Sequence, residues 1–290
     1  MIKYVPHHLI EREKYDQCIS QAKNGRIYAY SWYLDCVAEK WDLMVSGSYD
    51  VVMPLPRRRK YGINYIYMPS WTQQLGIFSK ELMAEEGIRQ FINRIPRKFI
   101  LVDYMLNAAN PLSAHAVVKR NNYILPLNGD YDTIRKGFNK NRQRISGHNF
   151  EHLRLEKNGH FSDFLRLYKG EVKNYSLPKD AIKKMENLLS LNNGHIQVWN
   201  VFAGQECIGG LVWTRDDRRI TYLIPIIKER AKKQHLNTFL INELIREYQN
   251  SDKFLDFEGS MVPGVAKFYS SFGAEVETYY FYQKRLIGHV

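Results

Sequence analysis

Two pairs of short segments in this chain resemble each other at one fixed separation. Tyr67 precedes Tyr222 by 155 residues, and Phe99 precedes Phe254 by the same 155 residues. The matching segments are NYIYMPSWTQQ from Asn64 with RITYLIPIIKE from Arg219, and RKFILVDY from Arg97 with DKFLDFEG from Asp252. Internal similarity at a fixed period is the sequence signature of repeated architecture. The chain is therefore predicted to contain two copies of one structural unit.

The pattern of apolar residues predicts the same order of elements in both halves. Each half has an antiparallel meander of three strands, then a helix, then two more strands. In the first half we expect a helix at 31–40, strands at 43–46, 51–55 and 61–68, a helix at 80–95, and strands at 99–104 and 116–125. In the second half we expect helices at 131–145, 161–174 and 179–191, strands at 153–156, 195–203, 207–214 and 219–225, a helix at 230–248, a strand at 254–257, a helix at 264–272 and a strand at 276–284. This pattern favours an α+β fold in which helices cover a sheet.

Composition excludes several classes of protein. The chain has 290 residues, of which 44% are hydrophobic and 25% charged, as is typical of globular domains. No stretch has the ~18 uncharged apolar residues of a membrane span, and the N-terminus lacks the apolar core of an export signal. The three cysteines form no Cys-x-x-Cys pair, and His7-His8 has no third ligand nearby, so we expect no disulfide framework and no metal site. We expect a cytoplasmic protein.

The net charge of +12 is spread over the whole chain, but one cluster is locally basic. The segment IRKGFNKNRQRIS, which includes Arg142 and Arg144, contains no acidic residue. Such a cluster either meets phosphate groups or forms a solvated helix face, and the residues leave both readings open.

Three features carry a resemblance to a known family. The segment LDFEGSMVPGVAKFYSSFGAE is similar to the pattern Asp-Phe-x-Gly, a loop, Gly-x-x-x-Phe-Lys and Phe-Gly. The segment YDTIRKGFNKNRQRI is similar to the basic helix that opens the second domain in that family. The third feature is the doubled order of elements, and the segment WTQQLGIF extends the likeness into the first half. On these features the chain resembles the GNAT superfamily of N-acyltransferases. More narrowly, it resembles the Fem (FemAB-like) peptidyltransferases, which carry two GNAT-like domains in tandem.

The resemblance covers most of the chain and implies its architecture and its site. It implies two GNAT-like domains, at 1–122 and 123–290, each a mixed, mostly antiparallel sheet with helices on both faces. Two parallel strands near the middle of such a sheet splay apart, and substrates enter the gap. The segment FLDF would end at this gap in the second domain, which is expected to carry the active site.

Acyl transfer to an amine needs a neutral amine, a carbonyl held close to it, a stabilised oxyanion and a proton for the leaving group. Glu258 is the candidate acceptor of the amine proton, and Tyr222 the candidate proton donor or hydrogen-bond donor to the carbonyl. The residues expected to bind substrate are Gln73, Gln74, Arg142, Arg144, Gly259, Ser260, Lys267 and Tyr269. The alternative readings are a strand-end carboxylate for Glu258 and a packed core tyrosine for Tyr222.

The resemblance also implies substrates. Fem-like enzymes take their acyl group from aminoacyl-tRNA, so we expect tRNA or another acyl carrier as donor, no tightly bound cofactor, and a peptidoglycan precursor or a related small amino compound as acceptor. Enzymes of the superfamily that use acyl-CoA usually carry Gln/Arg-x-x-Gly-x-Gly/Ala after the central strand, where backbone N–H groups bind the pyrophosphate. This chain has no glycine from Leu211 through Glu258, so acetyl-CoA is the less favoured donor.

Tyr269 is a second departure from the family, which often has Lys at this position after Phe. If that lysine binds substrate in the family, this chain lacks the group. Two further functions therefore stay open. One is acyl-CoA-dependent N-acetylation of an amino sugar or small amine, and the other is a non-catalytic binding module with the GNAT fold.

Overall fold

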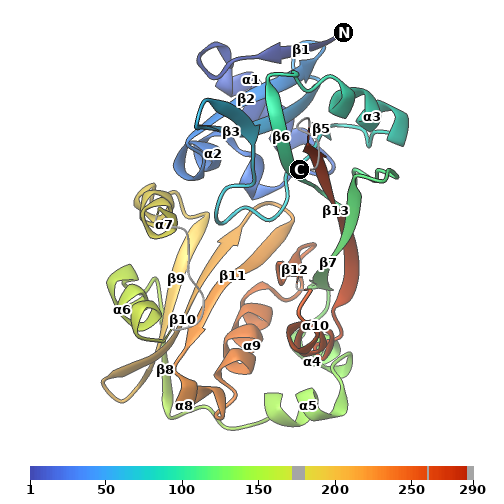
Figure 1. Cartoon of the computed structure of the whole chain (residues 1–290). Helices are drawn as coiled ribbons and strands as arrows, with labels where there is room; N and C mark the ends of the chain where they lie inside the picture. Colours follow the sequence, from blue (N-terminus) through green and yellow to red (C-terminus); the bar gives the residue numbers. More distant parts are fainter. Residues whose placement is uncertain (172–179, 260, 286–290) are drawn as a thin grey trace. The chain divides into compact units, whose positions relative to one another are not determined.

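The computed structural model describes residues 1–171, 180–259 and 261–285 and divides into two units (Figure 1). The first unit is residues 1–120 with the described parts of 178–190 and 278–290, and the second is residues 121–277 without 178–190. The division expected after residue 122 is close to the change at Arg120, but it needs a correction, because two later segments return to the first unit. Trp71 Nε1, for example, donates a 2.7 Å hydrogen bond to the Ala181 carbonyl.

The first unit is a sheet with the strand order β1-β2-β3-β4-β6-β13, in which β5 also pairs with β3. Its elements are β1 (Ile2–Val5), η1 (His7–Leu9), α1 (Arg12–Gln21), η2 (Ile27–Ala29), α2 (Ser31–Val37), β2 (Lys40–Ser46), β3 (Val51–Lys60), β4 (Ile63–Ile66), β5 (Phe78–Ser79), α3 (Glu85–Asn93), β6 (Phe99–Leu106), α7 (Ala181–Ser190) and the end of β13 (Glu275–Arg285). The helix α3 is amphipathic, with Ile88, Phe91 and Ile92 buried. The strand β1 and the helix α1 were not predicted from the sequence.

The second unit has the strand order β7-β12-β11-β10-β9-β8. Its elements are the end of β7 (Val117–Pro126), α4 (Tyr131–Lys136), α5 (Lys140–Ser146), β8 (Leu153–Lys157), α6 (Phe161–Glu171), β9 (Ile196–Ala203), β10 (Glu206–Arg215), β11 (Arg219–Ile227), α8 (Glu229–Lys232), α9 (Leu236–Tyr248), β12 (Phe254–Asp256), α10 (Pro263–Ser270) and the start of β13. A mixed sheet with mostly antiparallel pairs was expected. The pair β11–β12 is parallel, and β12–β7, β11–β10, β10–β9 and β9–β8 are antiparallel.

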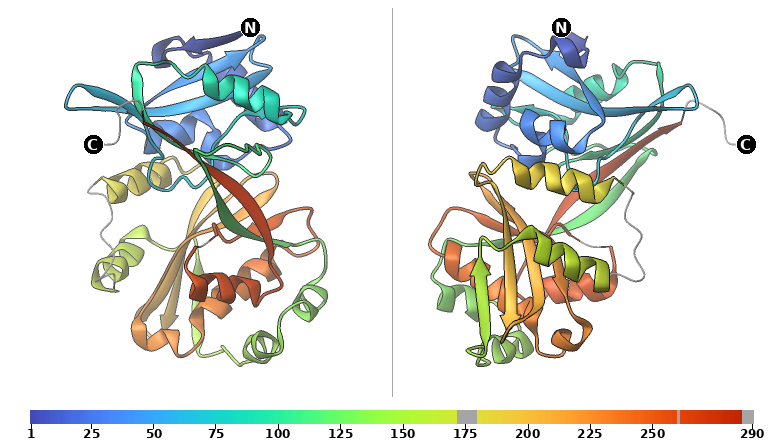
Figure 2. Two further views of the ribbon diagram at one scale, coloured as in Figure 1. Left: turned by 45° about the vertical axis from the view of Figure 1, so that its right-hand side comes forward. Right: turned by 90° about the vertical axis from the view of Figure 1, so that its left-hand side faces the viewer.

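Helices cover both faces of this second sheet, because neighbouring glycines of β10 face different helices. A Cβ atom added to Gly209 would lie 2.5 Å from Leu236 of α9, whereas one added to Gly210 would lie 2.9 Å from Phe164 of α6. Successive residues of a strand point to opposite faces. The helix α6 therefore covers one face and α9 the other (Figure 2).

The strand register supports the duplication at an offset of 155 residues. In the first unit β4 pairs with β6 in parallel, with Asn64 opposite Phe99. In the second unit β11 pairs with β12 in parallel, with Arg219 opposite Phe254. Adding 155 to both residue numbers of the first pair gives the residue numbers of the second pair. The strands β3 (51–60) and β10 (206–215) have the same offset at both ends.

Two predicted helices are each split in two. The helix expected at 131–145 is α4 and α5, because Asn139 begins a new helix by accepting the Arg142 N–H at 2.8 Å. The helix expected at 230–248 is α8 and α9, which are separated by His235 in the left-handed conformation (φ 61°). In the described part of the chain, no helix combines the length and the apolar character that a membrane crossing needs.

Candidate active site

The candidate site lies where the central parallel strands of the second unit separate. The strands β11 and β12 pair only from Arg219 and Phe254 to Thr221 and Asp256. Beyond this point β11 continues to Ile227 on its pairing with β10, whereas β12 ends. The residues that directly follow the last parallel pair are Tyr222 on one side and Phe257 and Glu258 on the other. The splayed arrangement implied by the GNAT resemblance is thus present in this unit.

Glu258 is held in a tight left-handed turn at the end of β12. Its φ is 57° and that of Gly259 is 65°. The Glu258 N–H donates a 2.9 Å hydrogen bond to Asp256 Oδ1, and the Phe257 N–H donates one of 2.9 Å to the Tyr123 carbonyl of β7. A left-handed residue other than glycine costs about 1–2 kcal/mol, so neighbouring contacts must hold it. The carboxylate is half-buried at this turn.

Tyr222 directs its phenol toward the start of α9. Its hydroxyl group donates a 3.3 Å hydrogen bond to Oδ1 of Asn237, the second residue of that helix. The first N–H groups of a helix have no partner within it, and they carry the positive end of its dipole. Burial, and to a smaller degree Tyr269, raises the pKa of Tyr222 far above its ordinary value. The phenol therefore stays protonated and can donate a hydrogen bond.

Tyr269 connects these two residues. Its ring stacks on Phe257 at 4.7 Å between centroids, and Phe257 in turn contacts Tyr222 at 6.3 Å. Burial, and then the charge of Glu258, raises the pKa of Tyr269 to about 12. Tyr269 therefore lies within electrostatic reach of both Tyr222 and Glu258, and the three residues form a row with Tyr269 in the middle. Tyr222 is only 2% exposed, so it forms the buried end of this row and does not line an open surface.

Arg142 was expected to bind substrate, but the structure buries its side chain. The guanidinium is 7% exposed and packs over the rings of Phe268 and Phe272 at 4.6 and 4.7 Å. It donates hydrogen bonds to Ser271 Oγ, at 3.0 Å, and to Thr238 Oγ1 in the first turn of α9. Burial lowers the pKa of Arg142 to about 10. The side chain supports the start of α9 from within.

The other residues predicted to bind substrate in the second unit differ in exposure and in the elements that they contact. Arg144 is exposed and bonds to Asn141 Oδ1 at 3.1 Å, and Lys267 is exposed on α10. Gly259 packs against β7, because an added Cβ would lie 2.2 Å from the Asn121 carbonyl oxygen. Ser260 lies outside the described residues. Of the predicted set, the structure brings together Tyr222, Glu258, Gly259 and Tyr269.

Gln73 and Gln74 belong to the first unit, in the loop after β4. Gln74 is buried and donates a 2.6 Å hydrogen bond to Gln73 Oε1. The next residue, Leu75, bonds to the end of β6 on both sides: its N–H reaches the Met105 carbonyl at 2.9 Å, and its carbonyl accepts the Asn107 N–H at 2.9 Å. This loop therefore fills the place beside β6 where the corresponding strands of the second unit separate.

Sequence reasoning missed four polar residues around the turn and the start of α9. Arg219 forms ion pairs with Asp256 and Glu277, and Asn237 bonds to Tyr222. A signal was present for one of them, since Asp256 interrupts the otherwise apolar segment FLDF. Charged residues are rarely buried unless they are paired.

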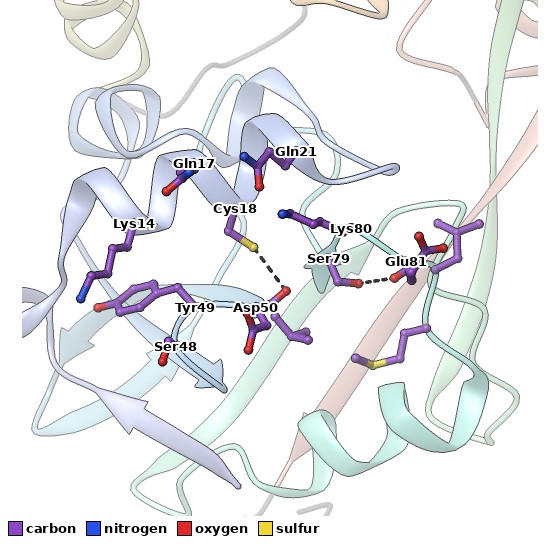
Figure 3. A pocket seen from close by; sticks show the side chains of 13 residues that line it. Lys14, Gln17, Cys18, Gln21, Ser48, Tyr49, Asp50, Ser79, Lys80 and Glu81 are labelled. Atoms are coloured by element: carbon purple, nitrogen blue, oxygen red, sulfur yellow. Dashed lines mark hydrogen bonds between the residues drawn. The ribbon is translucent and has the colours of Figure 1, made fainter.

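A separate pocket of about 520 Å³ lies in the first unit between α1, the β2–β3 turn and residues 79–83 (Figure 3). Cys18 forms part of its wall, and its thiol donates to the Asp50 and Phe78 carbonyls at 3.7 Å. Burial raises the pKa of Cys18 to about 11, and burial also raises the pKa of Cys207 in the second unit. Neither thiol has the lowered pKa of a nucleophile. None of the predicted site residues that the structure describes lines the pocket of the first unit.

Comparisons with known proteins agree with this architecture. A family model described as an acetyltransferase (GNAT) domain matches residues 133–259, a range that contains the splayed strands and the turn at Glu258. No curated protein matches the chain in sequence.

Several solved structures are similar in fold along almost the whole chain. The structure of FemX has a TM-score of 0.67 and 10% identity, and the similarity covers 94% of this chain and 96% of FemX. A tandem GNAT protein from the clavulanic acid biosynthesis pathway has a TM-score of 0.54 and 9% identity, with 98% of both chains covered. The L-PGS of Bacillus licheniformis has a TM-score of 0.51 and 11% identity, with 96% of this chain and 93% of that one covered. The chain is a tandem protein of the GNAT acyltransferase fold, similar to FemX in the fold of nearly its whole length.

Proposed function

We propose that this chain is an N-acyl or aminoacyl transferase of the Fem-like type, with its active site at the splayed strands of the second unit. The observation that carries the proposal is the row formed by Glu258, Tyr269 and Tyr222. Its members are a carboxylate and two protonated phenols, and Tyr222 and Glu258 follow the end of the parallel pairing of β11 with β12. The fold supports acyl transfer in general, and the row supplies the groups that this chemistry needs.

In the proposed reaction the amine nitrogen attacks the acyl carbon, a carbon–nitrogen bond forms, and the bond to the carrier oxygen breaks. Glu258 accepts the proton that the amine loses, directly or through one water. A phenol hydrogen bond stabilises the developing oxyanion, and the start of α9 adds the favourable end of the helix dipole. The leaving oxygen takes up a proton, for which the Tyr222 hydroxyl is the candidate donor, and the proton that Glu258 accepted then restores the phenol. The raised pKa values keep both phenols protonated between turnovers, so each can donate a hydrogen bond to the oxyanion.

We propose aminoacyl-tRNA as the donor in preference to acetyl-CoA. The residue before α9, His235, has the left-handed conformation that glycine favours. The segment from Leu211 to Glu258 contains no glycine. A side chain at this position hinders the close approach of a pyrophosphate to the backbone. The exposed cations on α4 and α5, Lys136, Lys140 and Arg144, are available to the phosphates of an RNA. The proposed acceptor is the amine of a peptidoglycan precursor, and the proposed location is the cytoplasm, where charged tRNA occurs.

A donor screen by mass spectrometry tests this proposal. The protein is incubated with amine acceptors and either charged tRNAs or acyl-CoAs, and the acceptor mass is monitored. We expect a mass increase of one aminoacyl residue only with charged tRNA. Transfer from acetyl-CoA, or a Kd for acetyl-CoA in the low micromolar range (about −8 kcal/mol), would replace the tRNA donor by acyl-CoA. Absence of transfer from every donor would favour a binding module.

The role of Glu258 has its own test. Glu258→Gln keeps the size of the side chain but removes its basicity, so kcat should fall about 10²-fold or more. A change of less than threefold would show that Glu258 is only a carboxylate at the end of a strand.

A further inference from the structure

A buried cluster of three charged side chains lies at the base of the splayed strands in the second unit. Arg219 Nη1 lies 2.6 Å from Asp256 Oδ2 and 3.0 Å from Glu277 Oε2, and Arg219 Nη2 lies 2.6 Å from Glu277 Oε1. The side chains of Arg219 and Asp256 are 8% and 4% exposed. The pKa of Arg219 is raised, because its attraction to Asp256 and Glu277 outweighs the effect of burial, which lowers it. The guanidinium therefore stays charged.

The cluster is directly connected to the turn that carries Glu258. One oxygen of Asp256 binds Arg219, and the other accepts the Glu258 N–H at 2.9 Å. Glu277 Oε2 also accepts a 3.2 Å hydrogen bond from Asn122 Nδ2. Asn122 lies in β7, the strand against which Gly259 packs. The cluster thus ties β11, β12, β7 and β13 together around two consecutive left-handed residues.

The first unit shows that the parallel strand pair forms without such a cluster. At the offset of 155 residues, Arg219 corresponds to Asn64 of the first unit. Asp256 corresponds to Leu101 by the offset, or to Val102 by strand register, because Ile66 pairs with Val102 as Thr221 pairs with Asp256. The pairing of Asn64 with Phe99 still matches that of Arg219 with Phe254. The charges are therefore not required for the strands to pair.

Sheet stability gives no other reason for the cluster. Removal of three charges from water costs free energy, and apolar replacements of buried ion clusters are often neutral or stabilising. What the second unit has at this place, and the first unit lacks, is the hydrogen-bonded left-handed turn at Glu258 and Gly259. The first unit has an exposed ion pair at the corresponding position, between Arg285 and Asp103 at 2.6 Å.

We propose that Arg219, Asp256 and Glu277 are positioning residues that hold the turn in its left-handed conformation and thereby fix where the Glu258 carboxylate lies at the end of β12. The inference rests on the proposed role of Glu258 as the proton acceptor. Arg219 orients Asp256, Asp256 holds the Glu258 backbone, and Glu277 fixes Arg219 from the opposite side. None of the three needs to touch a substrate.

Two variants of Asp256 separate the parts of this argument. Asp256→Ala removes the acceptor of the Glu258 N–H, while Arg219 keeps both of its contacts to Glu277. Asp256→Asn keeps an amide oxygen that can still accept this N–H, but it loses the charge that binds Arg219. We expect Asp256→Ala to lower kcat at least about tenfold with KM within twofold, and Asp256→Asn to lower it less. The matched control is Asp103→Ala in the first unit, which should leave kcat unchanged.

A double-mutant cycle with Glu258→Gln distinguishes positioning from general damage to the fold. If Asp256 acts through Glu258, Asp256→Ala should lower kcat less than threefold further in the Glu258→Gln background. An equal loss of kcat in both backgrounds would overturn the proposal.

Amide hydrogen exchange of Glu258 gives a readout that does not depend on activity. Its N–H should exchange at least tenfold faster in Asp256→Ala than in the wild type or Asp256→Asn, while the amides of β10 and β11 keep their protection. Unchanged exchange in Asp256→Ala would refute the hold on the turn even if Glu258 is catalytic. If Glu258→Gln alone leaves kcat unchanged, the proposed role of Glu258 fails, and the exchange rates still decide whether Asp256 holds the turn.

Discussion

Gly259 offers a quantitative test of the turn at the end of β12. Its φ of 65° lies in the left-handed region, and a Cβ added there would lie 2.2 Å from the Asn121 carbonyl oxygen and 2.7 Å from the Asn122 Cα. Both of these atoms are backbone atoms of the neighbouring strand, so no side-chain rotation relieves the contact. Gly259→Ala therefore combines the cost of a left-handed alanine, about 1–2 kcal/mol, with an overpacking cost of about 1–3 kcal/mol. We expect the free energy of unfolding to fall by about 2–5 kcal/mol.

Gly204 is the matched control for this substitution. It also lies in the second unit, in the β9–β10 turn, and its φ is 59°, but a Cβ added there would have nothing within 4 Å. Gly204→Ala should therefore show only the conformational cost of about 1–2 kcal/mol. The difference between the two variants isolates the contact with β7.

Urea unfolding followed by circular dichroism measures both losses. With an m-value of about 2 kcal/mol/M, the midpoint should fall by about 1–2.5 M for Gly259→Ala and by about 0.5–1 M for Gly204→Ala. Equal midpoints for the two variants would refute the close approach of the turn to Asn121. A second consequence follows from the first, because a displaced turn moves Glu258, and kcat should then fall in Gly259→Ala and not in Gly204→Ala.

Three further predictions concern the groups around the turn. Tyr222→Phe should lower kcat about 10- to 10²-fold and change the free energy of unfolding by no more than about 1.5 kcal/mol. Tyr67→Phe, the variant at the repeat-related position, should leave kcat unchanged. Similar steady-state kinetics for the two variants would contradict a role for the Tyr222 hydroxyl. Arg219→Met should lower the free energy of unfolding by about 3–5 kcal/mol, because it leaves the buried Asp256 and the partly buried Glu277 without their cation. Arg142→Met should change it by no more than about 1 kcal/mol, because Arg142 contacts hydroxyl groups and aromatic rings and its removal leaves no buried carboxylate unpaired. Equal losses in urea unfolding would contradict the distinction. The raised pKa of Tyr269 favours its protonated form in the folded state, so its contribution to stability is complete below a pH of about 10 and is lost as the pH rises through about 12. Urea unfolding at several values between about pH 9 and 12 should show a steeper loss of the free energy of unfolding for the wild type than for Tyr269→Phe. Parallel curves for the two proteins would argue against the raised pKa.

The sequence by itself determined the repeat and most of the elements. The offset of 155 residues was readable because both copies keep an apolar strand pattern of the same length, and the register of β4–β6 and β11–β12 agrees with it. Glycine, serine and a carboxylate after the strand FLDF also indicated that the chain turns at Glu258. These features are local, since a strand or a turn is recorded in consecutive residues.

The backbone conformation of particular residues could be predicted less well. The sequence has no glycine before α9, yet His235 adopts there the left-handed conformation, with a φ of 61°. The basic segment at 135–146 suggested exposed cations, yet Arg142 is buried between aromatic rings of α10 and the residues after it. Composition shows which charges are present, but only packing decides which of them leave the solvent.

Only the tertiary structure decided which residues meet at the site. Arg219, Asp256 and Glu277 lie on three different strands, and strand pairing brings their side chains within hydrogen-bond distance. The end of β13, from Thr278, belongs to the first unit and pairs there with β6. Its aromatic sequence predicts a strand but does not indicate this partner. The hydrogen bonds of a strand come from its backbone, which is the same in every sequence, so the pattern of a strand predicts that it pairs but does not name its partner. The partner is selected by the packing of the whole sheet, and with it the residues that surround Glu258.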